Sequence, residues 1–140
     1  MNRIINFLGF TVLFLQLSCS DHKQKVVLNP EKNVDDLYSV YKIDSINNYY
    51  LIYALRKNIH YKIISQKKPD AKGELVKKGN YYDFKIFSIL HFIDDSIPII
   101  GSVGCIYVAE NTKICVETED SIYDVFHAKN IKGLYFENIN

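Results

Sequence analysis

The sequence predicts a mainly β protein, and three observations support this class. Eleven tyrosines and many isoleucines favour strands, because aromatic and branched side chains pack well on a pleated surface. From Tyr38 onward apolar and polar residues alternate in steps of two, the period of a strand with one buried face. Short segments that end in asparagine interrupt this alternation, as hairpin turns do. We therefore expect an antiparallel meander that closes into a small barrel or a two-layer sandwich, with at most one or two short helices.

The first expected element is a single turn of helix before the meander. Val34, Leu37, Tyr38 and Tyr41 are spaced at i, i+3, i+4 and i+7, and Asn33 stands where a helix cap is expected. Because Tyr38 also begins the two-residue alternation, we expect the helical turn to end there.

Three strands follow, joined by three-residue loops at residues 46–48 and 56–58. The last residue of such a loop adopts the left-handed conformation, which asparagine tolerates better than any residue except glycine. This register predicts one continuous apolar face and an opposite face that is mixed and wetter. The apolar face consists of two rows, Tyr41, Tyr53 and Tyr61 beside Ile43, Leu51 and Ile63.

The middle of the chain is expected to hold a loop, a strand and a turn. Residues 69–73 contain proline, aspartate and glycine and predict a loop. Residues 80–90 alternate and predict one strand, and residues 94–96 predict a turn. Pro98 confines the short apolar segment 97–100 to a sheet edge or to the start of a strand.

A third loop that ends in asparagine, residues 109–111, joins the strands 103–108 and 112–118. Its register places Cys105 opposite Cys115. In an oxidising compartment this geometry favours a cross-strand disulfide, provided that the pair occupies a non-hydrogen-bonded site. The alternative is a pair of small buried thiols.

The C-terminal part of the domain is expected to contain one helix and one strand. Residues 121–127 predict a short helix, with Asp120 or Ser121 as its cap. A last strand is expected at residues 133–137.

The first 18 residues predict export from the cell. Arg3 provides a short basic start, and residues 4–17 are mostly apolar on all sides, unlike a core helix. This run is too short for a membrane span, which needs about 20 residues. Small residues follow it, as they do at the end of a secretory signal.

Residues 15–19 resemble a bacterial lipobox, in which a signal peptidase cuts before a cysteine that carries diacylglycerol. Ser18 matches the small residue before the cut and Cys19 matches the modified position, whereas Gln16 stands where leucine is usual. The resemblance implies a mature protein that begins at a lipidated Cys19 on the outside of a bacterial membrane. Ordinary signal cleavage after Ser20 is the alternative.

The cysteine count links this signal to the rest of the chain. Three cysteines in an exported protein leave one unpaired. A lipid on Cys19 would leave Cys105 and Cys115 as a pair.

We therefore expect three segments. Residues 1–18 form the signal peptide, residues 19–33 hold the lipidated cysteine and a polar tether, and residues 34–140 form a single β-rich domain. Arg3 is the only charge before Cys19, so removal of the signal reduces 17 basic residues to 16, against 16 acidic ones. A neutral mature chain predicts no nucleic-acid partner.

No catalytic or metal-binding pattern is evident in the sequence. The four histidines lie far apart, and none has a second imidazole at ligand spacing, so we expect no metal and no cofactor. His91 with Asp94 and Asp95 is the nearest approach to a cluster. The acidic group at residues 117–120 could raise the pKa of one of its members for acid–base work, but a solvated turn is the simpler interpretation.

Surface tyrosines are the best candidates for binding. Tyr49 and Tyr50, like Tyr81 and Tyr82, are adjacent, so one of each pair must face away from the core. We expect a non-enzymatic module of the cell envelope, anchored to the membrane by its lipid, that binds a protein or a glycan. The alternative is a small envelope hydrolase that uses the group around His91 or the acidic group. In size and layout the chain is similar to many small bacterial lipoproteins.

Overall fold

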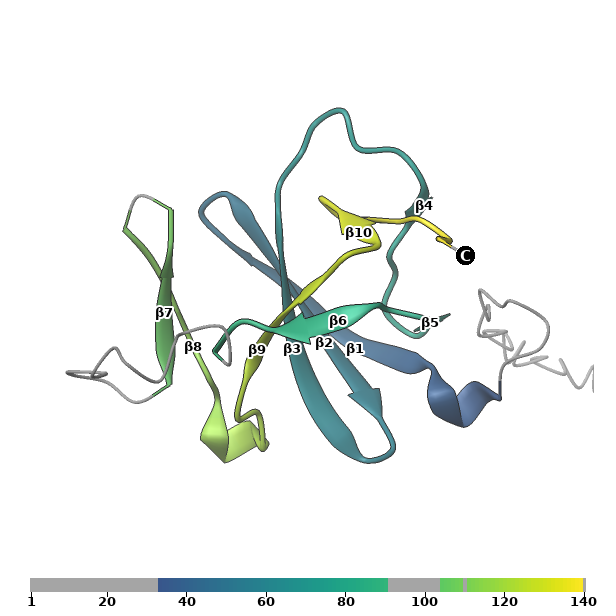
Figure 1. The fold of residues 1–140 in the computed structure, drawn as a ribbon, viewed down its shortest axis with the longest axis horizontal. Helices are drawn as coiled ribbons and strands as arrows, with labels where there is room; N and C mark the ends of the chain where they lie inside the picture. The colour runs from purple at the N-terminus through teal and green to yellow at the C-terminus, as the bar shows by residue number, and fades with distance from the viewer. Residues whose placement is uncertain (1–32, 91–103, 110, 140) are drawn as a thin grey trace, which may run out of the picture.

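The computed structural model describes residues 33–90, 104–109 and 111–139, and this part of the chain is a β protein, as predicted (Figure 1). The strands are β1 (Tyr38–Ile46), β2 (Tyr49–Arg56), β3 (Ile59–Gln66), β4 (Glu74–Leu75), β5 (Tyr81–Tyr82), β6 (Ile86–Ser88), β7 (Cys105–Val108), β8 (Thr112–Cys115), β9 (Val125–Ala128), β10 (Ile131–Lys132) and β11 (Tyr135–Phe136). Two 3-10 turns, η1 (Val34–Asp36) and η3 (Thr118–Asp120), flank parts of this strand framework. None of the described helical elements is long and apolar enough to cross a membrane.

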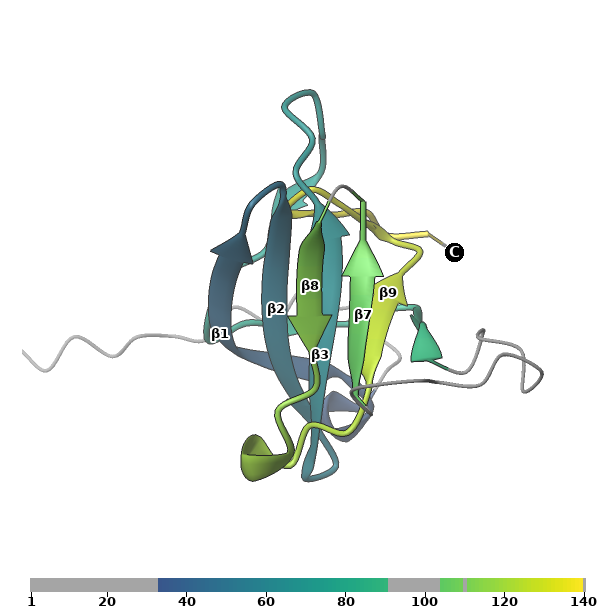
Figure 2. The same cartoon turned by 90° about the vertical axis from the view of Figure 1, so that its left-hand side faces the viewer.

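The largest sheet is curled into a half-barrel. Its strand order is β5-β1-β2-β3-β9-β6, so β5 and β6 form its two opposite edges. Only residues 83–85 separate these strands in the chain, and a segment of that length spans at most about 14 Å. The two edges must therefore approach each other, and Figure 2 shows the curvature that results. The single strand predicted at residues 80–90 is divided between the two edges.

The central strands β2 and β3 are buried on both faces, so the predicted wetter face was wrong for Lys62, whereas Lys42 and Asp44 on β1 are exposed. The β7–β8 hairpin, a separate two-stranded sheet, covers one face. The small sheet β10-β11-β4 and the segment around Phe84 cover the other. The first core contains Tyr38, Val40, Ile52, Ala54, Ile63, Val76, Tyr82, Phe84, Ile131 and Phe136. The second core contains Leu51, Tyr53, Ile64, Ile106, Ile114, Ile122 and Val125.

The first two hairpins close with two-residue turns rather than the predicted three-residue loops. These turns are residues 47–48 and 57–58. Asn47 has φ 48°, Lys57 has φ 48° and Asn58 has φ 62°. A two-residue hairpin turn needs positive φ at one or both central residues, which asparagine tolerates. The residue expected to open each loop belongs instead to the preceding strand.

Neither predicted row forms, because each register differs by one residue. Tyr53 lies opposite Lys62, and Tyr61 lies opposite Ala54 on the other face of the sheet. The β1–β2 register also shifts between Val40 and Lys42, as a bulge does. The structure divides the members of the two rows between the cores, with Ile43, Tyr61 and Ile63 against the first and Tyr41, Leu51 and Tyr53 against the second.

The predicted elements at the two ends of the domain have mixed outcomes. The helical turn before Tyr38 is present as η1, and the side chain of Asn33 accepts a hydrogen bond from the Asp35 amide. The last strand is present as β11. The helix predicted at residues 121–127 was wrong, because β9 begins at Val125, which is fully buried and pairs with β3 in parallel. The segments expected at 94–96 and 97–100 lie outside the described residues.

Candidate functional site

A groove of about 430 Å³ separates β1 from β8. Figure 2 shows how it arises: the β7–β8 hairpin lies over the β3 and β9 side of the sheet, and β1 lies beyond its edge. At one end of β8, Asn47 donates a hydrogen bond to the Thr112 hydroxyl at 3.0 Å, which ties the hairpin to the β1–β2 turn. The groove is lined by Lys42, Asp44, Ser45, Ile46, Leu51, Tyr53, Lys62, Lys113, Ile114, Cys115 and Glu117.

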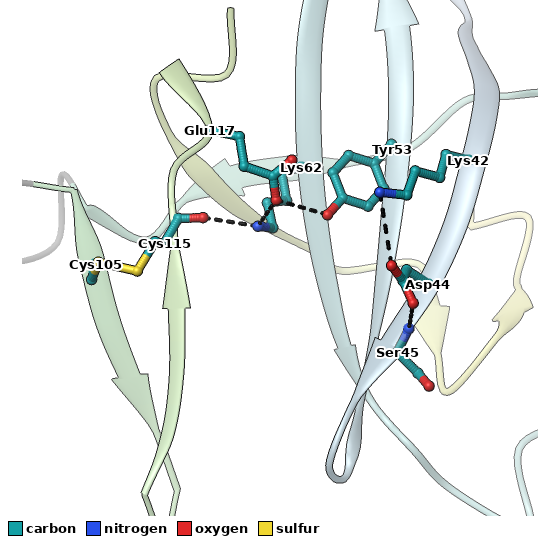
Figure 3. A network of polar contacts seen from close by, with 8 residues as sticks. All are labelled: Lys42, Asp44, Ser45, Tyr53, Lys62, Cys105, Cys115 and Glu117. Carbon is teal, nitrogen blue, oxygen red and sulfur yellow. Dashed lines mark hydrogen bonds and ion pairs between the residues drawn. A yellow bond between two sulfur atoms is a disulfide. The ribbon is translucent and has the colours of Figure 1, made fainter. Parts of the chain in front are cut away.

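A buried ion pair closes the other end of the groove (Figure 3). Lys62 is only 4% exposed, and its Nζ donates to Glu117 Oε1 and, at 2.8 Å, to the carbonyl oxygen of Cys115. The Tyr53 hydroxyl donates to the same Glu117 oxygen at 2.9 Å. A buried ammonium requires such partners, because an unpaired charge is very unfavourable away from water. This network therefore fixes the hairpin to the sheet.

The pKa directions in this network favour charge binding over proton transfer. Burial raises the pKa of Tyr53, and its hydrogen bond to the Glu117 carboxylate raises it further, so the phenol keeps its proton. Burial alone would raise the pKa of Glu117, but hydrogen bonds from Lys62 and Tyr53 lower it below the ordinary value of 4.5. Glu117 is therefore ionised at neutral pH.

This lowered pKa predicts a specific loss of stability in acid. A carboxyl group whose pKa is lower in the folded state stabilises the fold above its unfolded value of 4.5, and this contribution disappears as the pH falls through the folded value. We expect the free energy of unfolding, measured with urea at a series of pH values, to decrease below pH 4.5 more steeply in the wild type than in Glu117→Gln. Equal slopes in the two proteins would contradict this assignment.

The β1 wall of the groove is an open strand edge. Among the described strands, β1 beyond Val40 pairs only with β2. Asp44 protects part of this edge, because its Oδ1 accepts a hydrogen bond from the backbone amide of Ser45 at 2.7 Å. Lys42 Nζ lies 3.7 Å from Asp44 Oδ2 and 4.5 Å from the centre of the Tyr53 ring. Charged side chains and a bulge are features that protect open edges from unwanted pairing.

The β8 wall is a second open edge, since β8 pairs only with β7 in the part of the chain that the structure describes. The Val116 amide donates to the Gly104 carbonyl at 2.6 Å. Because hydrogen-bonded and non-hydrogen-bonded pairs alternate, the backbone groups of Cys115 and Lys113 point away from β7, toward the groove. The Cys115 carbonyl accepts a hydrogen bond from Lys62 Nζ. Within the described residues the Lys113 side chain has no ion pair.

A disulfide joins Cys105 and Cys115 across the hairpin (Figure 3), on the outer side, opposite to the side on which Ile106 and Ile114 face the second core. The predicted register of this hairpin is confirmed: Cys105 pairs with Cys115 and Val108 pairs with Thr112. The same alternation places the two cysteines in a non-hydrogen-bonded pair, the position that the sequence argument required.

Loss of this disulfide should reduce stability measurably. We expect the double variant Cys105→Ser, Cys115→Ser to lose about 2–3 kcal/mol of unfolding free energy, since the bond closes a short loop in the unfolded chain. Urea unfolding of the oxidised wild type and of the variant measures this difference. Reduction with dithiothreitol should weaken the wild type and leave the variant unchanged, and an equal effect on both would contradict the prediction.

The four tyrosines proposed for binding lie outside the groove. As expected, one tyrosine of each adjacent pair faces the core: Tyr49 is 9% exposed and Tyr82 is fully buried, so neither is available as a surface binding residue. The ring of Tyr82 stacks on Phe84 in the first core. Tyr50 and Tyr81 are half-buried, with Lys67 over the ring of Tyr50 and Tyr81 lining a separate hollow near η1.

Two exposed tyrosines were missed. Tyr107 is 74% exposed and Tyr123 is 70% exposed. The hairpin register could have identified Tyr107, because it lies two residues after Cys105 and therefore shares the outer side of the hairpin with the disulfide.

The acidic group at residues 117–120 lines a shallow hollow beside η3, and only Glu117 among its members also lines the groove. Glu117 faces the groove, whereas Glu119 and Asp120 are exposed on η3. The described residues contain no group of three or more potential metal ligands. His91, Asp94 and Asp95 lie outside the described residues.

No family model, curated protein or solved structure matches this chain. The described residues define a disulfide-bonded β domain with a charged groove between two open strand edges.

Proposed function

We propose that this chain is an exported lipoprotein, anchored through Cys19, whose β domain is a non-enzymatic module that binds an extended segment of another envelope protein. The observation that carries the proposal is that one groove is flanked by two open strand edges, β1 and β8. Extended peptides bind such edges through main-chain hydrogen bonds. The binding site would therefore be the groove between β1 and β8.

A protein segment suits this groove better than a glycan. Sugar rings stack on exposed aromatic faces through their apolar C–H groups. The aromatic residue of the groove, Tyr53, is only 3% exposed, and Lys42 covers its ring. The groove therefore offers backbone groups and charges rather than an open aromatic surface.

A small envelope hydrolase is the second candidate, because Glu117, Lys62 and Tyr53 converge at one end of the groove. A general base works best when its pKa lies near the operating pH. Hydrogen bonds from Lys62 and Tyr53 move the pKa of Glu117 in the opposite direction despite its partial burial. This arrangement supports binding over catalysis.

The N-terminal signal and the cysteine count support the lipid anchor. With Cys105 and Cys115 joined to each other, Cys19 is the remaining cysteine of the three. We expect Cys19→Ser to release the protein from the membrane and to remove the lipid mass in mass spectrometry. A Cys19→Ser protein that stays membrane-bound, with a mass changed only by the substitution, would overturn the anchor.

Site-specific crosslinking in cells tests the groove as the binding site. A photocrosslinking phenylalanine derivative at Ser45 stands on the groove wall, and the same derivative at Lys72 stands in the exposed loop after β3. We expect a discrete protein adduct from position 45 and none from position 72. No adduct, or the same adducts from both positions, would overturn the proposed site.

A further inference from the structure

We infer that the groove takes an acidic extended peptide, which pairs with the open edge of β8 and places a carboxylate beside Lys113. This inference rests on the proposed function and names the chemistry of its ligand. Backbone geometry selects the edge, and the balance of charges selects the acidic ligand.

The backbone groups favour β8 over β1 as the pairing edge. On β1, the outward amide of Ser45 is already bonded to the Asp44 carboxylate. On β8, the carbonyl of Cys115 is bonded to Lys62, but the amide and carbonyl of Lys113 point toward the groove. A peptide strand that pairs with Lys113 would satisfy both of these groups.

The charges lining the groove leave one cation without a partner. Glu117 neutralises Lys62, and Asp44 lies 3.7 Å from Lys42. Lys113 has no ion pair within the described residues, although it lines the same groove. A strand paired with β8 places one side chain directly opposite Lys113, where opposite charges stabilise and like charges destabilise the pair. An aspartate or glutamate at that position therefore fits best.

A second copy of this chain fits the edge poorly. An antiparallel pairing of two β8 strands centred on Lys113 would place the two lysines opposite each other. Centring the pair on Ile114 would set Lys113 opposite Cys115. The Cys115 carbonyl already accepts a hydrogen bond from Lys62, so it could not pair with the second copy. A peptide with its own acidic residue meets neither obstacle.

Selection from a library of random linear peptides displayed on phage tests the inference, with the mature chain carrying Cys19→Ser as the target. We expect the selected peptides to be enriched in aspartate and glutamate. Their synthetic forms should bind Lys113→Glu about tenfold more weakly than the parent, because an attractive ion pair becomes repulsive. Lys72→Glu makes the same change in net charge outside the groove and should leave affinity unchanged. Lys113→Arg keeps the charge and should also bind.

Each other outcome has a defined meaning. Selected peptides that are neutral or basic, yet crosslink to position 45, would overturn the acidic ligand and leave the proposed function standing. If no peptide bound above background, the result would contradict both the acidic ligand and the proposed function. Equal losses in Lys113→Glu and Lys72→Glu would overturn the role of Lys113. A dimeric mass in light scattering that persists in the presence of peptides would show that a second copy of the chain occupies the groove. Competition by a uronate oligosaccharide would show that the occupant is a glycan.

Discussion

Ile63→Ala and Ile64→Ala should each lower the free energy of unfolding by about 2–5 kcal/mol, the usual range for truncating a large aliphatic residue in a core. Neighbouring residues on a strand point to opposite faces of the sheet. Ile63 is 0% exposed in the first core and Ile64 is 1% exposed in the second. In a sheet with one wet face, only one of these substitutions would have a large effect.

Urea unfolding of the two variants measures this two-sided burial, and Ile59→Ala on the same strand provides the control. Ile59 is 55% exposed, so its truncation should change the unfolding free energy by no more than about 0.5 kcal/mol. If Ile64→Ala resembled Ile59→Ala, the hairpin would not cover this face in solution, and the second core would be wrong.

Glu117→Gln should destabilise the protein by about 2–3 kcal/mol, because it leaves the ammonium of Lys62 buried without a counter-charge. Removal of one partner from a fully buried ion pair has a larger effect, about 3–5 kcal/mol. The Lys62 side chain is 5% exposed, but the Glu117 side chain is 31% exposed. Water that reaches the Glu117 position can therefore partly compensate for the lost carboxylate. The loss should therefore lie below that range.

The matched control is Glu119→Gln, which makes the same chemical change on the exposed η3 turn and should be nearly neutral. Adding Lys62→Met to Glu117→Gln should recover part of the lost stability, since no buried charge then remains. Equal stability of the two glutamine variants would show that the ion pair does not hold the hairpin to the sheet.

The hairpin registers show how much of the fold could be predicted from local signals. The β7–β8 register was correct because its loop has three residues and ends in Asn111, which has φ 70°. The first two hairpins carry the same signal, an asparagine before a strand. A two-residue turn and a three-residue loop both accept asparagine in the left-handed conformation, so the signal alone does not fix the length.

The groove was harder to predict, because its walls come from distant parts of the chain. Lys62 was placed on a wet face, since nothing in the alternation of β3 indicates a second covering layer. The residues that bury it, Cys115 and Glu117, are separated from it by more than 50 positions. The acidic pattern suggested a raised pKa for one member of the group at residues 117–120, whereas the pKa of Glu117 is lowered, because the tertiary structure supplies hydrogen bonds from Lys62 and Tyr53.

The parallel pairing of β3 with β9 also determines the order in which the domain can assemble. The β1–β2–β3 meander and the β7–β8 hairpin join residues close together in the chain, so their loops close early. The pair of Lys62 with Val125 joins residues 63 positions apart, and distant contacts form slowly. We expect the groove to be complete only after β9 has docked. Under the proposed export, both hairpins would therefore exist before the molecule acquires the groove.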